Sequence, residues 1–315
     1  MTGFTSTSPD YLVRSEVWSS QLKDVLQDEL MAQKYVNWLN DFPDGDTFTI
    51  PSVSGQMQVD DYEEDTSISY HAMDTGEFQF SITEYLSSAT YITNKQKQDS
   101  FYMSQLTSSF VPAQNRAIMV RLETDILDLA MSQTLSAANN INGAAHRFVA
   151  SGTSEAMTVV DFARALHSLK KANVPQTNLI AIVDPSVEYT LNTLTNLVNF
   201  SNNPQWEGIV TSGIATGMRF IKNIYGFDVY TSNYLATANE TISGLATAAG
   251  KANMFFSAAP GVSPFVGAWR QQTKVDSSYN KDYQREEYVT TARYGVKLFR
   301  PENLVVVLSD TDVVA

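Results

Sequence analysis

Two segments with the period-two pattern of a half-buried strand are separated by a stretch that has little material for a core. Large apolar side chains alternate with polar ones at residues 47–50 and again at 78–83, as they do in strands with one buried face. The 27 residues from Pro51 to Glu77 include an acidic run, Asp60 to Asp65. A structureless loop of that length is uncommon inside a compact domain. The sequence therefore predicts a long two-stranded hairpin that projects from the body.

A projecting hairpin needs another protein surface, because an isolated two-stranded hairpin is marginally stable in water. The acidic run is either a solvated loop or a contact for a basic strip, such as Arg293, Lys297 and Arg300, on another subunit. Residues 251–300 carry eight basic and four acidic groups, whereas residues 1–46 carry three and eight, which favours contacts between subunits. The candidate subunit-interface residues are Trp18, Leu22, Phe48, Ile50, Asp60, Asp61, Glu63, Glu64, Phe78, Phe80, Arg293 and Arg300.

The segment before the hairpin has a different pattern. Residues 1–14 are small and polar, and a helical pattern follows from about Ser15 to Asn40. Its apolar positions recur every four residues, at Trp18, Leu22, Leu26 and Leu30. The pattern predicts an arm that ends in an amphipathic helix, which packs on its own domain or on a sister subunit.

A long helix is predicted over residues 93–138. Its apolar positions form one stripe, at Ile118, Leu122, Ile126, Leu129 and Met131. Pro112 marks a start or a kink, because proline lacks the backbone N–H that a helix interior needs. The part after Pro112 alone would be about 40 Å long at the standard rise per residue. The polar cluster from Asn139 to Gly143 ends this helix.

The second half of the chain predicts a small α/β or α+β unit. Thr158 and Asp161 have the spacing of a capping box. A strand from Leu179 to Val183 leads into a helix with Asp184 as its N-cap and Pro185 at its first position. Residues 236–250 are small and predict a loop. Further strands are predicted at residues 219–224, 227–230, 252–257, 287–298 and 304–308.

The composition excludes several classes of protein. With 21 Lys and Arg against 34 Asp and Glu, the net charge is −13, which argues against a dedicated nucleic-acid reader. The chain has no cysteine, so disulfides and thiolate metal sites are excluded. The N-terminus does not have the pattern of a signal peptide, and the longest aliphatic run, Leu304 to Leu308, is too short for a membrane span. We expect a soluble, intracellular protein whose uncharged polar surface favours assembly.

The known catalytic motifs are absent from the sequence. Residues 208–213 lack the spacing and the lysine of a phosphate-binding loop, and residues 152–156 lack the second glycine of a nucleophile elbow. His71, His146 and His167 are too far apart for a paired metal site, and the aspartates at 41–46 lack the spacing of a calcium loop. We therefore expect no catalytic, cofactor or metal site.

Three short sequence segments are also informative: Asn178 to Pro185, where a strand meets a capped helix, Ile224 to Asn233, and Ala292 to Glu302. Together with the order of arm, hairpin, long helix and α/β unit, they resemble the tailed-phage major capsid proteins that share the Hong Kong phage coat fold. This resemblance covers nearly the whole chain and implies an α+β fold. The implied parts are an N-terminal arm and helix (1–45), an extended hairpin loop (46–92), a peripheral domain with a spine helix (93–140), an axial domain (141–254), further peripheral strands (255–295) and a return to the axial domain (296–315).

The resemblance implies a structural, non-enzymatic subunit of a virion. Its copies would form hexamers and pentamers of an icosahedral shell that encloses double-stranded DNA without reading its sequence, assembled in the host bacterial cytoplasm. Portal, scaffold or decoration proteins are possible partners, and no membrane is involved. The alternatives are an encapsulin-type shell with a protein cargo, a minor virion protein, and an enzyme with a site at the loops after Val183 and Gly213. One branch of the family crosslinks neighbours through a Lys–Asn isopeptide, but no matching pair is identified here.

Overall fold

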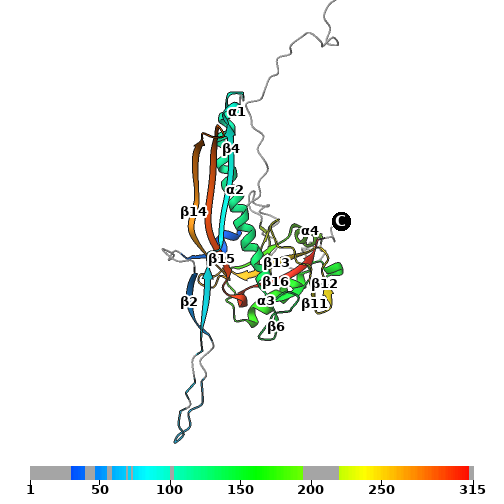
Figure 1. The fold of residues 1–315 in the computed structure, drawn as a ribbon. Helices are drawn as coiled ribbons and strands as arrows, with labels where there is room; N and C mark the ends of the chain where they lie inside the picture. The colour runs from blue at the N-terminus through cyan, green and yellow to red at the C-terminus, as the bar shows by residue number, and fades with distance from the viewer. Residues whose placement is uncertain are drawn as a thin grey trace, which may run out of the picture.

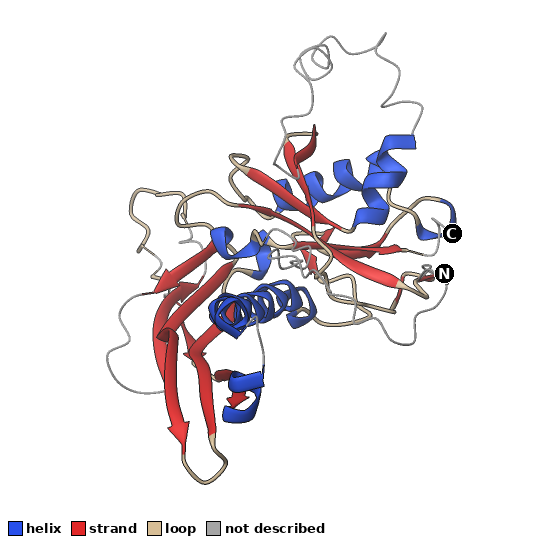
Figure 2. Cartoon of the chain, turned by 90° about the horizontal axis from the view of Figure 1, so that it is seen from above, coloured by secondary structure: helices blue, strands red, loops and turns tan. Residues whose placement is uncertain are grey.

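A computed structural model of the chain describes residues 30–39, 47–54, 59–68, 70–71, 74–99, 103–193 and 220–311. The described residues form an elongated unit, a compact unit beside it, and a hairpin that projects from the region where the two meet (Figure 1). Viewed from above, the long helix α2 lies between the sheet of the elongated unit and the compact unit (Figure 2).

The elongated unit is a four-stranded sheet with a long helix on one face. The strand order is β1-β14-β15-β4, and only the β1–β14 pair is parallel. A short helix, α1, follows β4 directly, and α2 runs back along the sheet (Figure 1). The bounds are β1 (Val36–Leu39), β4 (Glu84–Thr93), α1 (Asn94–Asp99), α2 (Met103–Leu127), β14 (Phe265–Asn280) and β15 (Arg285–Leu298).

The compact unit is built on a mixed six-stranded sheet in the order β7-β16-β13-β8-β10-β9. Its strands are β7 (Arg147–Val149), β8 (Leu179–Val183), β9 (Phe220–Ile224), β10 (Phe227–Thr231), β13 (Gly250–Ser257) and β16 (Val305–Asp310). Its helices are α3 (Val159–Lys171) and α4 (Pro185–Thr193). The smaller elements are η1 (Ala32–Tyr35), η2 (Asp128–Ser132), β5 (Asn140–Ile141), β6 (Ala144–Ala145), η3 (Thr153–Glu155), β11 (Thr241–Ile242), β12 (Leu245–Ala246) and η6 (Pro301–Asn303).

Polar side chains of α2 fix its register against the sheet. Thr290 on β15 donates to Oε1 of Gln114 at 2.8 Å, and about three turns further along the helix the Tyr294 hydroxyl donates to Asp125 Oδ2 at 2.6 Å. Both β15 side chains are fully buried. A buried polar group that loses its partner costs about 1–3 kcal/mol. These hydrogen bonds therefore allow one alignment of helix and sheet, which apolar packing alone would specify less sharply.

The predicted helix starts of the compact unit are confirmed. Asp161 Oδ2 accepts a hydrogen bond from the backbone N–H of Thr158 at 2.8 Å, which satisfies a donor at the start of α3. Asp184 Oδ2 accepts from the N–H of Ser186 at 3.0 Å, and Pro185 is the first residue of α4. Both starts are local chemistry, so the sequence was sufficient to find them.

The predicted helix over 93–138 is longer than the observed one. The α-helix ends at Leu127 and tightens into η2, which ends at Ser132. Arg147 Nη1 donates to the carbonyl of Ala130 at 2.7 Å and so satisfies one of the free carbonyls at this end. Pro112 lies inside α2 and does not start it. The helix is shorter because a distant arginine, which periodicity cannot reveal, supplies its terminal partner.

The helix predicted from Ser15 to Asn40 is also corrected where the structure describes it. Residues 15–29 and 40 lie outside the described residues. From Ala32 the chain forms a 3-10 turn and then a strand, because Val36 to Leu39 pair in parallel with Phe265 to Ala268. Tertiary pairing overrides the helical pattern here.

Two long strands were not predicted from the sequence. Residues 84–92, expected to belong to the projecting hairpin, form most of β4 and pair with β15. Residues 274–279 in the far half of β14 are all exposed and include only two large apolar side chains, Val275 and Tyr279, so the regular alternation that marks a half-buried strand is absent. The predicted loop at 236–250 contains the short β11–β12 hairpin.

A buried ion pair joins the compact unit to the end of the long helix. Arg147 is fully buried and Glu240 is 6% exposed. Arg147 Nε donates to Glu240 Oε2 at 2.9 Å, and the N–H of Ser136 donates to the same oxygen at 2.7 Å. Together with the Ala130 carbonyl described above, these contacts tie β7, η2 and the loop before β11 to one guanidinium.

We expect Arg147→Met to lower the free energy of unfolding by about 3–5 kcal/mol, because it leaves the Glu240 carboxylate buried without its counter-charge. Urea unfolding of the purified subunit measures this loss. Lys274→Met is the matched control, since Lys274 and its partner Asp276 are 64% and 60% exposed and such a pair contributes little. Equal losses in the two variants would contradict this account of the buried pair.

The same pair gives a pH dependence of known sign. Burial works to raise the pKa of Glu240, but hydrogen bonds from Arg147 and Ser136 outweigh it and hold the pKa below its ordinary value. Glu240 therefore stabilises the fold above its unfolded-state pKa of about 4.3, and this stabilisation is lost as the pH falls through the lower folded-state pKa. We expect the difference in unfolding free energy between wild type and Glu240→Gln to shrink in acid. A difference that grows in acid, in urea titrations at several pH values, would be the opposite result.

Candidate assembly surfaces

The projecting hairpin is docked at its root in the subunit's own core. Strands β2 (Thr47–Ser54) and β3 (Asp74–Ser81) pair in register from Thr47–Ser81 to Ser54–Asp74. Phe80 is 1% exposed and packs with Ile82, Val266 and Ala268. Gly295 on β15 lets the chain pass closely, because a Cβ there would lie 2.7 Å from the Ser81 carbonyl oxygen. The root is therefore held by core packing.

A lysine and two aromatic rings hold the next residues of the hairpin. Lys297 Nζ donates to the carbonyl of Gln79 at 2.8 Å and lies 5.0 Å from the centre of the Phe78 ring. The rings of Phe78 and Phe299 meet edge to face with centroids 4.9 Å apart. Such contacts add to the burial of the rings themselves. The first residues beyond the root thus have partners within the subunit.

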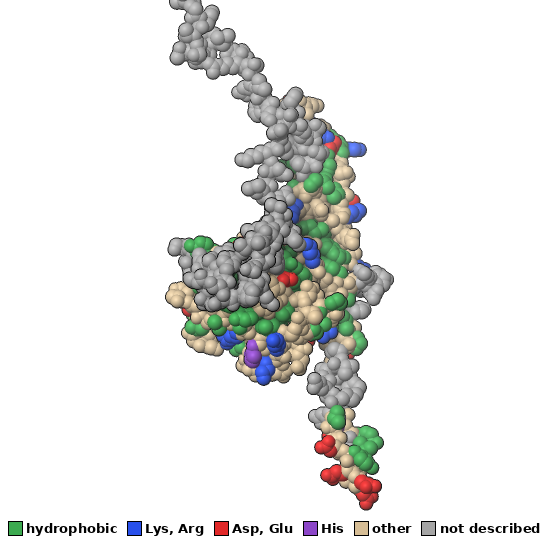
Figure 3. All heavy atoms as spheres, turned by 180° about the vertical axis from the view of Figure 1, so that it is seen from behind, with side chains coloured by type: hydrophobic (Ala, Val, Ile, Leu, Met, Phe, Trp, Pro, Cys, Tyr) green, Lys and Arg blue, Asp and Glu red, His purple; other side chains and the backbone are tan. Residues whose placement is uncertain are grey.

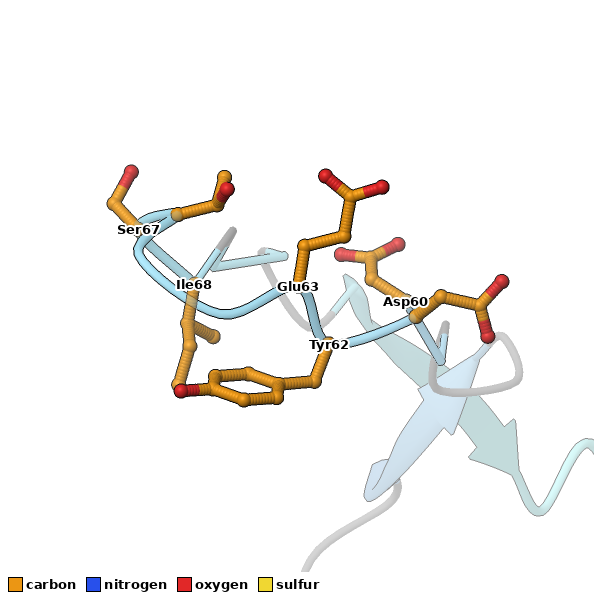
Figure 4. Close-up of a pocket in the computed structure, with 7 residues that line it drawn as sticks. Asp60, Tyr62, Glu63, Ser67 and Ile68 are labelled. Atoms are coloured by element: carbon orange, nitrogen blue, oxygen red, sulfur yellow. The ribbon is translucent and has the colours of Figure 1, made fainter.

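The tip of the hairpin, residues 59–71, has few partners among the described residues. Val59 and Tyr70 are 93% and 94% exposed, and Tyr62 and Ile68 also face solvent. Acidic side chains gather at this end of the molecule beside apolar ones (Figure 3). Figure 4 shows a hollow in the tip, with Tyr62 and Ile68 on one side of the chain and Glu63 on the other. The tip therefore presents an apolar side and an acidic side.

The carboxylates of the tip lie close together along the chain. Asp60 Oδ2 is 2.6 Å from His71 Nε2, and no other carboxylate from 60 to 65 makes an ion pair with a described residue. Within the described ranges, no group of three or more His, Asp or Glu side chains is arranged to hold a metal ion. The tip is an uncompensated acidic and apolar surface, which suits a partner of opposite charge.

The structure separates the candidate interface residues of the arm and the hairpin into four groups. Asp60, Asp61, Glu63 and Glu64 are exposed on the tip, as an interface role requires. Phe80 is a correction, because its buried ring packs in the subunit's own core and cannot reach a neighbour. Trp18 and Leu22 lie outside the described residues. The hairpin positions Phe48, Ile50 and Phe78 lie on β2 and β3, where Phe48 pairs with Phe80 and half-buried Ile50 with half-buried Phe78.

The basic strip of β15 is partly engaged within the subunit. Lys297 binds the subunit's own hairpin, as described above. Arg300 Nη1 lies 3.9 Å from Glu302 Oε1, with its guanidinium over the Phe299 ring. Arg293 is half-buried, opposite Gln271 and Tyr85 in the sheet. A contact between this strip and the acidic run of another copy stays a prediction.

A second cationic surface was not predicted. Arg164, His167 and Lys171 lie on one exposed side of α3 at spacings of three and four residues, with Lys170 beside them. Arg164 lies over the Phe148 ring, but none of the four forms an ion pair within the described part of the chain. Their helical spacing is visible in the sequence and is the signal that would have identified this surface.

The chain segment from Met31 to Leu39, here called the strap, joins the two units. Glu123 of α2 accepts hydrogen bonds from the backbone N–H groups of Met31 and Ala32, and Ser263 donates to the carbonyl of Tyr35. The Tyr35 ring meets Phe256 of the compact unit edge to face, with centroids 5.6 Å apart. Burial raises the pKa of both Glu123 and Tyr35.

The strap is also fitted closely to the sheet. Gly267 on β14 lies opposite Trp38, and a Cβ on Gly267 would be 2.8 Å from the Trp38 ring and 2.9 Å from Val36. The Trp38 ring stacks on Trp269 at 5.4 Å. The strap thus places the start of the described chain on the long helix.

Among the described residues, none of the helices combines the length and the apolar character needed to span a membrane. A comparison with curated proteins found no match. Solved structures match along nearly the whole chain. A structure from Mycobacterium phage Che8 is 17% identical with a TM-score of 0.67, covering 93% of this chain and 96% of that one.

Two further capsids show the same likeness. The capsid of the cyanophage P-SCSP1u is 16% identical with a TM-score of 0.69, covering 94% of this chain and 92% of its own. The mature capsid of bacteriophage PhiM1 is 11% identical with a TM-score of 0.71, covering 95% and 93%. At this identity, the likeness establishes the fold, which is the α+β capsid fold that the sequence suggested.

The family follows from the sequence itself. Residues 56–307, well over half of the chain, match the model of a family described as phage capsid protein. The matched region includes the hairpin tip, the long helix and most of the compact unit. The chain therefore belongs to the phage capsid protein family.

Proposed function

We propose that copies of this chain form hexamers and pentamers that close into an icosahedral shell around double-stranded DNA. The observation that carries the proposal is the hairpin, whose root is docked in its own subunit while its tip presents exposed apolar and acidic groups. Exposed aromatic side chains such as Tyr62 and Tyr70 are typical of protein interfaces. A neighbouring subunit would cover the tip, and the residues before the strap would make a second contact.

The two units of the fold would correspond to the two domains of a capsid subunit. The elongated unit, with the spine helix α2, would be the peripheral domain, and the compact unit would be the axial domain around which subunits gather. Permanent interfaces bury about 2,000–5,000 Å². Shared among hairpin, arm and unit edges, an area of this size would hold the shell together through many contacts that are each modest.

The negative net charge of the chain suits a shell that encloses DNA without binding it tightly. A net charge of −13 disfavours tight binding to a phosphate backbone, so the inner wall would let packaged DNA slide. The absence of cysteine fits assembly in the reducing cytoplasm of a bacterial host. The role is structural and non-enzymatic, with a portal, scaffold or decoration protein as possible further partners.

Replacing residues 52–76 by a short turn removes the tip and leaves the docked root, including Phe78 and Phe80. We expect a folded, soluble subunit that forms no closed shells, because the contact supplied by the tip is lost. Electron microscopy of the expressed protein counts shells, and circular dichroism checks the fold.

The matched control keeps the length of the hairpin and changes only its charge, by Asp61→Asn, Glu63→Gln and Glu64→Gln. If the acidic side makes the contact, this variant assembles less at low salt than wild type does, and the difference fades as salt screens the charges. Normal shells from the shortened variant would refute the role given to the hairpin.

A further inference from the structure

Glu123 is an unusual residue for the buried side of the long helix, near its C-terminal end. Its side chain is fully buried, and burial raises its pKa. Its Oε1 accepts from Met31 N–H at 3.0 Å and from Ala32 N–H at 2.9 Å, and its Oε2 accepts from Ala32 at 3.0 Å. The first backbone N–H groups of a short helical turn have no partner within the turn. The carboxylate supplies that partner at the point where the strap begins.

Packing alone does not require a carboxylate at this position. Ile118, Leu122 and Ile126 are almost fully buried and supply the apolar contacts of α2. A buried charge is costly, and an apolar side chain of similar volume would often stabilise a core as well or better. What the carboxylate adds is a directed hold on two amides of a segment 91 residues away in the chain.

A positive charge on the same helix also acts on this carboxylate, after the backbone hydrogen bonds of the strap. Arg116 precedes Glu123 by seven residues, which is about two helical turns, so both lie on one side of α2. The positive charge of Arg116 lowers the pKa of Glu123 against the effect of burial. Arg116 Nη2 is buried and has no hydrogen-bond partner among the described residues. The guanidinium therefore has an unused donor on the side of the helix that carries Glu123.

We propose that Glu123 is the positioning residue of the N-terminal arm and that it exchanges partners: it binds the Met31 and Ala32 amides when the strap is seated, and Arg116 when the strap lifts. The exchange keeps the buried carboxylate paired in both states, so the strap can lift without leaving an isolated charge. This inference rests on the proposed function only in giving the arm a neighbouring subunit to contact.

The change of partners at Glu123 would couple the contact between the arm and a neighbouring subunit to the rest of the fold. The strap touches β14 through Trp38 and the compact unit through Tyr35. A pull on the arm from a neighbouring copy would act first on the two amides held by Glu123. When these hydrogen bonds break, the strap no longer ties the elongated unit to the compact unit. Arg116 then stabilises the carboxylate of Glu123.

Hydrogen exchange at the Met31 and Ala32 amides of the free, full-length subunit tests the proposal. We expect Glu123→Gln to lower their protection by roughly tenfold or more, because a charged acceptor is replaced by a neutral one. We expect Arg116→Met to raise their protection, because the competing partner of the lifted state is removed. Arg121→Met is the control, since exposed Arg121 pairs with Asp125 on α2, and it leaves both amides unchanged.

The decisive result is that Glu123→Gln and Arg116→Met change the protection of the two amides in opposite directions. If Arg116 and Glu123 only pack the helix, both variants lower protection, which overturns the exchange. Unchanged protection in Glu123→Gln overturns the positioning role. Should Glu123→Gln fail to fold, Glu123→Asp retracts the carboxylate by one methylene and is expected to lower protection less. The readout uses unassembled subunits, so a failure of wild type to form shells would refute the proposed function and leave this test intact.

Discussion

The structure depends on buried polar groups on two opposite sides of the long helix, one facing β15 and the other facing the strap. Gln114, Glu123 and Asp125 of α2 reach partners in β15 and in the strap. Each of these groups would be costly to leave unpaired, so helix, sheet and strap fit together in one register. Apolar packing around Leu122 and Ile126 then joins this assembly to the inner faces of both sheets. One helix thereby aligns segments that lie far apart in the sequence.

The same body gives the hairpin and the strap a firm root, and the described residues of the hairpin tip have few partners within the subunit. The hairpin is fixed by Phe80, Gly295 and Lys297, yet its tip is exposed on all sides. The strap is fixed by Glu123 and Trp38. A fixed root sets the direction of the hairpin, and its exposed tip is available to a neighbouring subunit. This explains how a capsid subunit can be folded alone and still be incomplete.

Local chemistry made part of this fold predictable from sequence. The hairpin followed from two alternating segments around an acidic run, and the starts of α3 and α4 followed from Asp161 and Asp184. Structure decided by distant partners was not predictable. The strap has a helical pattern, but pairing with β14 makes it a strand, and the solvent-facing far half of β14 has no alternation to detect.

The candidate surface shows the same limit. The exposure of the acidic residues follows from their number and spacing, whereas Phe80 turned inward because Val266 and Ala268, almost 190 residues later, form a pocket for it. The sequence predicted Lys297 as part of a basic strip facing another subunit. In the structure its Nζ donates to the carbonyl of Gln79 in the subunit's own hairpin. The inward position of Phe80 and the contact of Lys297 within the subunit both depend on residues that no local window of sequence contains.

We propose that an adjacent identical copy covers the tip of the hairpin in the shell. Electron cryomicroscopy of assembled particles tests it most directly, by showing what surrounds Tyr62 and Ile68 in the shell. We predict that an adjacent copy covers both side chains, which are exposed in the single subunit. Particles in which the tips extend into solvent, or a protein that stays monomeric at high concentration, would contradict it.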